Sequence, residues 1–412
     1  MASLESPHDE PDADVFGPLI SIKPESLIRL GTNLRSPLLN KPTSSSRLVA
    51  RISGSHNLIH ILQLDNLKLV VRVPATGWGE GMTGAAARAL ESQVAVMRFI
   101  SRETKIPVPT VYDFDTGIRN EIGAPYICMS FLPGRTVSEV WFDECGPTPL
   151  EHRRISILES VAQAVAQLSS FSFATIGSPY DAGGESLAIG PCYHWRENDD
   201  YTVHVTASGP YGTTAAYLQD CSAAKDTKGV WGLAESKIID VVVPCLPEGP
   251  TGFVLSVPDF DSQNILVDEG GALTGIIDWD LVQTMPRCVG YCRYPGWITR
   301  DWDPLMYGWP KRASENSPQE LERYRKIYNE KMGEALGGGG DWKYTKKSEV
   351  REAVWIAALN STNRLEICRK LVQVAIGDGK KALDILYDIG SDRLSEQDWH
   401  ALRGKLMKLV SG

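Results

Sequence analysis

Residues 253–280 read FVLSVPDFDSQNILVDEGGALTGIIDWD, and the predicted fold and chemistry both depend on this stretch. Two short apolar runs, at residues 265–267 and 273–277, are separated by the turn-forming residues Asp268-Glu-Gly-Gly271. Apolar runs on either side of a glycine-containing turn predict a β-hairpin. Because the two ends of a hairpin lie side by side, polar residues just before and just after it are expected to lie close together.

Three polar side chains occupy these ends of the hairpin. Asp259 and Asn264 precede its first strand, and Asp278 follows its second. Two carboxylates and an amide oxygen suit Mg²⁺, and the spacing D-x-x-x-x-N matches the catalytic loop of kinase-fold enzymes, whose aspartate accepts the proton of a substrate hydroxyl. The alternative is that all three are ordinary turn residues that cap a hairpin. Their agreement in position favours the phosphoryl-transfer interpretation.

The chain before this hairpin has the pattern of a small β-rich lobe with one helix. Alternating and β-branched runs predict strands at residues 47–52, 58–64, 68–73, 107–114 and 126–132. The Ala-rich segment 85–102 predicts a helix, since its apolar residues recur at helical spacing, at Leu90, Val94, Met97 and Ile100. Pro133-Gly134 then breaks the chain and is interpreted as a hinge.

The chain after this break is predicted to be mainly helical. Amphipathic or helix-forming segments lie near residues 150–171, 231–243, 317–336, 347–377, 379–388 and 395–410. Residues 175–230 are rich in Gly, Ser, Tyr and Asp, and they are too long for a simple connection. We interpret them as an insertion that shapes a substrate site.

These patterns predict an α+β fold with two lobes. We expect a flexible acidic tail over residues 1–20 and a small β-rich N-lobe, a sheet with one helix, over residues 21–132; the resemblance described below implies that this sheet binds nucleotide. A larger, mainly helical C-lobe over residues 133–412 is expected to hold the catalytic loop, the metal hairpin and the insertion at 175–230.

Composition indicates which binding partners are unfavourable and in which cellular compartment the protein is expected. The 412 residues carry a formal charge of −9 without a run of Lys and Arg, which disfavours nucleic-acid binding. No apolar run reaches the roughly 18 residues of a membrane helix, so we expect no membrane partner. The N-terminus is acidic and lacks the apolar core of a secretory signal. The eight cysteines are dispersed with no C-x-x-C pair, so we expect reduced thiols in a cytoplasmic protein.

Several segments resemble the aminoglycoside phosphotransferase and choline kinase family, in particular its fungal phosphotransferase branch. They are PDFDSQNILVD (258–268), TGIIDWD (274–280), QTMPRCVGYC (283–292), PGWITRDWDP (295–304), IPVP (106–109), NEIGAPYI (120–127) and GPCYHW (190–195). The resemblance extends from about residue 48 to the last helices. It implies a bilobal protein-kinase-like fold, with ATP in the cleft and the substrate on the C-lobe.

The resemblance implies a role for each residue of the hairpin site. Asp259 would be the catalytic base, and Asn264 and Asp278 would be the metal ligands. The function implied is that of an ATP- and Mg²⁺-dependent phosphotransferase, which transfers phosphate to a hydroxyl of a small molecule. The sequence does not distinguish ATP from GTP or select the acceptor.

The nucleotide site implied by the resemblance lies in the β-rich lobe. Arg72 stands where the family has the lysine that grips the α- and β-phosphates, and Ser55 lies in the turn 53–57 where the phosphate-covering loop belongs. The segment MSFLPG (129–134) resembles the hinge. Met129 would be the gatekeeper, and the backbone of Ser130 and Leu132 would hold the edge of adenine.

Three departures from the family pattern support other functions. The family motif begins with a histidine that supports the loop, and Val257 stands there. Arg72 replaces the phosphate-binding lysine, and Gln93 falls where a helix glutamate would pair with it, although Glu91 lies on the same helix. A scaffold repurposed as a non-phosphorylating enzyme, such as a cyclase or isomerase of secondary metabolism, is therefore an alternative, as is a pseudokinase that only binds ligands.

The tract CRYPGWITRDWD (292–303) combines aromatic and acidic residues after the second strand of the hairpin. Aromatic faces and carboxylates suit a cationic or amphipathic small molecule, and the candidate substrate residues are Asp280, Trp297 and Asp301. Aromatic packing with capping acids explains the tract equally well. His194 and Trp195 are interpreted as structural residues.

Overall fold

The computed structural model describes residues 13–34, 45–183, 186–197, 202–223, 228–249 and 252–412. The chain folds into two compact units. Unit 1 consists of residues up to 134, residues 177–210 and residues 274–283, and unit 2 consists of residues 135–176, 211–273 and 284–412. Each unit is therefore assembled from three separate stretches of the chain.

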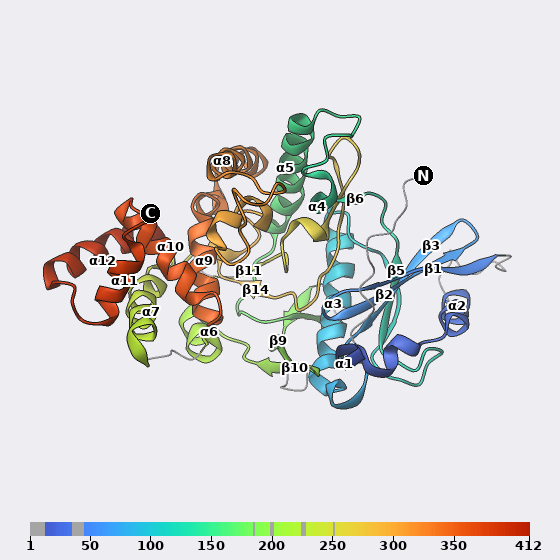
Figure 1. The fold of residues 1–412 in the computed structure, drawn as a ribbon. Helices are drawn as coiled ribbons and strands as arrows, with labels where there is room; N and C mark the ends of the chain where they lie inside the picture. The colour runs from blue at the N-terminus through green and yellow to red at the C-terminus, as the bar shows by residue number, and fades with distance from the viewer. Residues whose placement is uncertain (1–12, 35–44, 184–185, 198–201, 224–227, 250–251) are drawn as a thin grey trace. The chain divides into compact units, whose positions relative to one another are not determined.

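A five-stranded antiparallel sheet forms the centre of unit 1 (Figure 1). Its strands, in the order β1-β2-β3-β5-β4, are β1 (Ser46–Ser53), β2 (Asn57–Leu64), β3 (Leu67–Pro74), β5 (Tyr126–Ser130) and β4 (Val111–Asp115). Helix α2 (Pro24–Asn33) packs against β1 and β2. The sheet corresponds to the predicted strands, but β4 begins only at Val111, because the prolines before it cannot donate to a strand ladder.

Helix α3 (Gly84–Glu103) is the predicted helix of this unit. Its predicted apolar stripe is buried, and the side chain of Thr83 accepts a hydrogen bond from the N–H of Ala86 at its start. Strands β7 (Pro179–Asp181) and β8 (Leu187–Ile189) form one hairpin, and β9 (Cys192–Glu197) and β10 (Val203–Ser208) form another. Both hairpins pack against α3, so this part of the predicted insertion belongs to unit 1.

The predicted tail is ordered where the structure describes it. Residues 1–12 lie outside the described residues, but Ala13–Phe16 form the helical turn α1 and Gly17–Ser21 a 3₁₀ turn. The side chains of Phe16 and Leu19 are buried in the core that β2 and β3 form. The prediction of a flexible tail through residue 20 is therefore wrong for residues 13–20, because their few apolar side chains enter a core that the local acidic pattern does not reveal.

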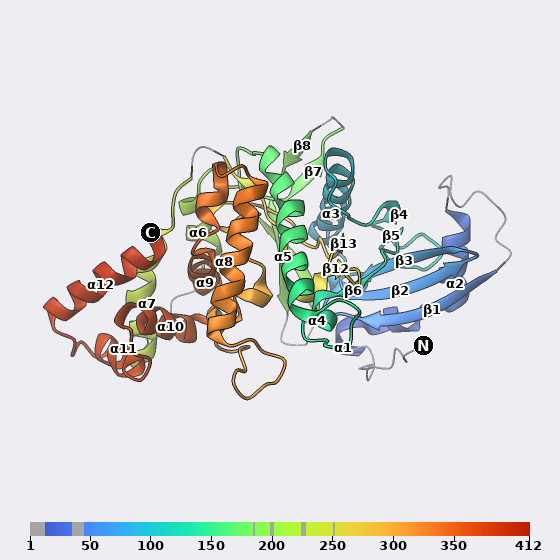
Figure 2. The same cartoon turned by 90° about the horizontal axis from the view of Figure 1, so that it is seen from above.

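Unit 2 is mainly helical. Its helices are α4 (Val137–Val140), α5 (Leu150–Ala166), α6 (Thr214–Cys221), α7 (Gly229–Val242), α8 (Pro318–Ala335), α9 (Ser348–Leu359), α10 (Arg364–Ile376), α11 (Ala382–Gly390) and α12 (Glu396–Ser411). Helices α5 and α8 pack side by side, and α7 packs against α10, α11 and α12 (Figure 2). None of the described helices of the chain is both long and apolar enough to cross a membrane.

Short strands flank the predicted catalytic loop of unit 2. β11 (Val254–Leu255) pairs with β14 (Thr284–Met285), and β12 (Ile265–Val267) pairs with β6 (Arg135–Thr136). The turn after β12 is closed by the N–H of Asp268, which donates to Ala272. The strands and turn of the predicted hairpin are thus present, and β13 (Leu273–Ile276) carries the chain back into unit 1.

The observed division differs from the predicted one in two places. The chain first leaves unit 1 at Gly134, next to the predicted boundary at 132/133, but it returns twice, at residues 177–210 and 274–283. The sequence-based prediction places both of these stretches in the C-lobe, residues 133–412. The predicted α+β class is confirmed, with a β-rich unit and a larger, mainly helical unit.

Candidate active site

The loop from Val257 to Asn264 in unit 2 holds the predicted catalytic base. Asp259 is exposed, and its carboxylate Oδ2 accepts hydrogen bonds from Asn264 Nδ2 at 2.8 Å and Gln263 Nε2 at 3.0 Å. Asn264 Nδ2 also donates to the backbone oxygen of Asp259 at 3.0 Å. Asn264 is buried, and its amide nitrogen holds the loop through these two hydrogen bonds to Asp259. Its Oδ1 is the atom that remains to bind a cation.

The backbone of Asp259 is strained. Its φ angle is 34°, which lies in the left-handed region that only a few per cent of residues other than glycine occupy, Asp and Asn more often than most. Such a residue costs of order 1–3 kcal/mol and persists only where its surroundings impose it, most often at functional sites. Asp278 in unit 1 has the same feature, with φ of 63°. The two aspartates singled out by the sequence are therefore both held in unusual backbone conformations.

Asp259 lies on the wall of a pocket of about 370 Å³ in unit 2. The pocket is acidic, with lining residues that include Asp261, Trp302, Asp303, Glu349 and Glu352. Asp261 forms an ion pair with Arg300 at 2.6 Å, and Glu352 forms one with Arg293 at 2.9 Å. Oδ1 of Asp303 and Oε2 of Glu349 are buried and have no hydrogen-bond partner within the described residues.

The predicted substrate residues Trp297 and Asp301 lie elsewhere. Trp297 is buried and packs edge-on against Phe260, and the carboxylate of Asp301 is buried in a two-point ion pair with Arg325 at 2.6 and 3.3 Å. This burial argues against direct contact with a substrate. The aromatic and acidic residues of the same tract that do line the pocket are Trp302 and Asp303. The sequence could not separate them from their neighbours, because two short 3₁₀ turns set their directions.

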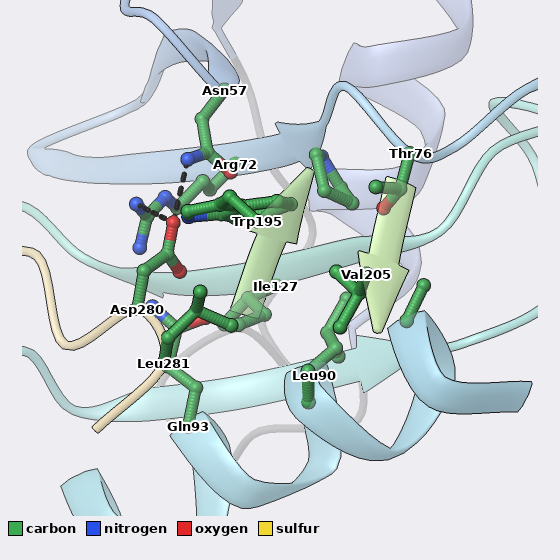
Figure 3. A pocket seen from close by; sticks show the side chains of 13 residues that line it. Asn57, Arg72, Thr76, Leu90, Gln93, Ile127, Trp195, Val205, Asp280 and Leu281 are labelled. Atoms are coloured by element: carbon green, nitrogen blue, oxygen red, sulfur yellow. Dashed lines mark hydrogen bonds and ion pairs between the residues drawn. The ribbon is translucent and has the colours of Figure 1, made fainter. Parts of the chain in front are cut away.

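An ion-pair cluster in unit 1 surrounds the predicted metal ligand Asp278. Arg72 Nη2 donates to Asp278 Oδ1 at 2.6 Å and to Asp280 Oδ2 at 2.7 Å, and Asn57 Nδ2 donates to the same oxygen of Asp280 at 2.8 Å. Figure 3 shows Asn57 and Arg72 directed at the Asp280 carboxylate. Asp280 is therefore the carboxylate partner of Arg72, in place of the helix glutamate whose position Gln93 occupies. This role of Asp280 differs from the predicted contact with substrate.

Burial and charge determine the protonation of this cluster. Burial raises the pKa of Asp280 to about 6, although the charge of Arg72 opposes this shift. For Arg72, burial lowers the pKa, but the negative charges of Asp280 and Asp278 outweigh it and raise the pKa above its ordinary value. The guanidinium therefore stays charged and remains the counter-ion of both carboxylates.

The hairpin of β9 and β10 closes the space next to this cluster. Trp195 stacks on His56 with ring centroids 4.5 Å apart and an interplanar angle of 4°. Trp195 and Val205 line a pocket of only about 30 Å³ beside Arg72 and Asp280, which is room for little more than a water molecule (Figure 3). Trp195 thus has the structural role that the sequence favoured, and it packs on the turn predicted to cover the phosphates.

The predicted nucleotide residues lie on the sheet of unit 1. Ser55 is exposed in the turn between β1 and β2, and Met129 and Ser130 end β5. The N–H of Ser130 donates to the oxygen of Thr110 at 2.9 Å, so this N–H is not available to an adenine edge. Leu132 is half-buried just after the strand.

The three hairpin residues divide between the units. Asp259 and Asn264 belong to unit 2, whereas Asp278 belongs to unit 1. Their convergence on one metal therefore stays a prediction. Within the described residues, no group of three or more His, Cys, Asp or Glu side chains is arranged to hold a metal ion, so a magnesium site would need an amide or phosphate oxygen as well.

The D-x-x-x-x-N loop and the following aspartate match the pattern of the phosphotransferase family. The sequence model of the phosphotransferase enzyme family matches residues 49–289, more than half of the chain, and the chain belongs to this family. The predicted resemblance is confirmed, and with it the kinase-like α+β fold.

Among curated proteins, the chain is similar to two fungal relatives. It is 28% identical over 137 residues to altered inheritance of mitochondria protein 9, mitochondrial, of Candida tropicalis, covering 32% of this chain and 22% of that protein. It is 30% identical over 128 residues to a subtelomeric hrmA-associated cluster protein of Aspergillus fumigatus, covering 31% of this chain and 23% of that protein. The match thus spans less than a quarter of the length of either relative.

Among solved structures, the chain is similar to aminoglycoside phosphotransferase APH(4)-Ia. The two are 15% identical, the alignment covers 94% of this chain and 99% of that chain, and the TM-score is 0.44.

Proposed function

We propose that this protein is an ATP- and Mg²⁺-dependent phosphotransferase that acts on an alcohol group of a small molecule. The observation that carries the proposal is the anchored, strained Asp259 on the wall of an open pocket, in a chain of the phosphotransferase family. An exposed carboxylate held by Asn264 and Gln263 can accept the proton of a hydroxyl that is bound beside it.

Each unit, taken by itself, keeps polar atoms of the kind that a magnesium nucleotide would need. Asn264 keeps Oδ1, and Asp278 keeps Oδ2, because their other polar atoms are engaged by Asp259 and Arg72. Nε of Arg72 is a buried donor without a partner in the described part of the chain, and an arginine can bind phosphate oxygens. Bound Mg²⁺ would supply neutralisation of the phosphate charge.

The acidic pocket suggests which acceptor the enzyme takes. Asp259, Asp303 and Glu349 have no basic partner among the ion pairs of the described residues. We therefore propose an acceptor that carries a cationic group as well as its hydroxyl. Burial raises the pKa of Glu349, and a bound cation beside it would oppose that shift.

The test is nucleotide-dependent turnover by the purified full chain. ATP or GTP with Mg²⁺ should raise the melting temperature, and ADP or GDP release should increase with amino alcohols as acceptors. Asp259→Asn should lower kcat by about 10²- to 10⁴-fold, the usual contribution of a general base. The matched control is Asp392→Asn, whose parent side chain is 81% exposed and should not affect turnover.

A second candidate function is supported by Arg72. Arg72 is paired with Asp278, a proposed metal ligand, and so is not a free cation for binding phosphate. Val257 also stands where the family has the histidine that supports the loop. A non-phosphorylating enzyme or a pseudokinase would retain such a closed cluster. Turnover that needs neither nucleotide nor divalent metal would establish the first of these, and nucleotide binding without product from any acceptor would establish the second.

A further inference from the structure

The residue two positions before Asp259 has no polar side chain that could hold the loop. Val257, two residues before the catalytic aspartate, is apolar and 1% exposed, so its side chain contributes packing but no hydrogen bond. Ser256 before it is also buried. The strained conformation of Asp259 must therefore be imposed on this side by another part of the chain.

Arg293 provides this support from outside the loop. Its Nη2 donates to the backbone oxygen of Val257 at 2.8 Å, and its Nη1 donates to Oγ of Ser256. The centre of the guanidinium lies 5.6 Å from the ring centroid of Phe260, the residue after Asp259. One buried side chain thus contacts the loop on both sides of the catalytic aspartate.

Glu352 of helix α9 completes the arrangement. Its Oε1 accepts a hydrogen bond from Arg293 Nε at 2.9 Å, and the side chain of Arg293 is only 9% exposed. The guanidinium therefore uses Nε, Nη1 and Nη2 in three different directions, toward the helix and toward two loop residues. A lysine has a single nitrogen, which cannot reproduce this planar fork.

The downstream half of the loop is held differently. The N–H of Asp261 donates to the backbone oxygen of Asp259 at 2.7 Å, and Asn264 donates to the same oxygen at 3.0 Å. These contacts follow from local spacing and do not reach the residues before Asp259. Arg293 is consequently the described side chain that fixes the entry to the loop, while Asn264 fixes its exit.

We infer that Arg293 is a positioning residue, which clamps residues 256–260 so that the carboxylate of Asp259 points into the substrate pocket. The inference rests on the proposed function, because it gives Arg293 a purpose in phosphoryl transfer. It acts through Asp259 and takes no proton itself. A misplacement of about 1 Å in a reacting group can cost about 10²-fold in rate, which sets the scale of the effect.

The test compares Arg293→Met with Arg364→Met. Arg364 is a matched control, because it is 2% exposed and likewise donates to backbone oxygens, those of Ala357, Ala358 and Ala223. Hydrogen–deuterium exchange of peptides covering residues 254–264 should rise in Arg293→Met and stay at the wild-type level in Arg364→Met. At a temperature well below both melting points, kcat should fall by about 10- to 100-fold in Arg293→Met, with KM for ATP changed by less than about threefold.

The outcomes separate this inference from the proposed function. Unchanged exchange at residues 254–264 in Arg293→Met overturns the clamp, and so does an equal loss of kcat in both variants. If the wild type transfers no phosphate to any acceptor, the proposed function fails, and the exchange measurement still decides whether Arg293 holds the loop. If Arg293→Met does not fold, Arg293→Lys keeps a charge opposite Glu352 and should show intermediate exchange and kcat; wild-type values for both would overturn the need for the fork.

Discussion

The ion-pair cluster at Arg72 makes a quantitative prediction about unit 1. Replacement of Arg72 by Met keeps the stem but leaves Asp280, whose side chain is 19% exposed, with the neutral amides of Asn57 and Gln93 and without a cationic partner among the described residues. Loss of one member of a buried pair costs about 3–5 kcal/mol, since the other charge stays buried. The leg to Asp278 adds little, because that carboxylate is 37% exposed and water can solvate it. We therefore expect Arg72→Met to lower the free energy of unfolding by about 3 kcal/mol.

The assay is urea unfolding followed by tryptophan fluorescence, with melting temperatures as a second measure. A loss of about 3 kcal/mol in a unit of this size corresponds to about 6–12 °C. Arg29→Met is the control, because the Arg29–Glu121 pair is 57% and 40% exposed and should contribute less than about 1 kcal/mol. Asp280→Leu in the Arg72→Met background should recover part of the loss. A loss in Arg72→Met no larger than in Arg29→Met would refute the reasoning.

Three further predictions concern stability. Burial lowers the pKa of His60 from 6.5 to about 4, so as the pH falls the unfolded chain takes up a proton at this histidine before the folded chain does. The free energy of unfolding should therefore fall by about 3 kcal/mol between pH 6.5 and pH 4. Urea titrations of His60→Leu should show a flatter dependence on pH. Gly271 has φ of +88°, and a Cβ would lie 2.5 Å from the oxygen of Arg153, so Gly271→Ala should cost at least about 1–3 kcal/mol. Gly270→Ala, which meets nothing closer than 3.4 Å, should melt near the wild type. Ser317→Ala should lose about 1 kcal/mol of α8 capping, whereas Ser317→Thr should not, as thermal melts will show.

The strands and helices could be predicted because their signals are local. The stripe of Leu90, Val94 and Met97 repeats with the period of one helix, and its burial follows from that period alone. The loop from Asp259 to Asn264 could also be found, since the amide that fixes it is only five residues away. Its identification needed no knowledge of distant contacts.

The long-range partners could not be predicted. Asn57 and Asp280 are 223 residues apart in sequence, and Arg72 and Asp278 are 206 apart. The sequence next to each of these residues does not indicate its partner, because the chain contains many other carboxylates and amides that could equally form such a contact. The same limitation applies to residues 292–303, where the sequence favours Trp297 and Asp301 but the aromatic and acidic residues that line the pocket are Trp302 and Asp303.

Periodicity and short spacings therefore predicted the α+β class and the candidate catalytic loop of this protein, and quoted motifs carried the resemblance to its family, because each of these signals depends on residues close together in sequence. Only the folded chain showed that Asp280 neutralises Arg72, that residues 177–210 pack onto α3, and that Arg293 grips the loop at Val257. Those contacts depend on how distant segments are brought together by a common core, and that arrangement is a property of the whole chain.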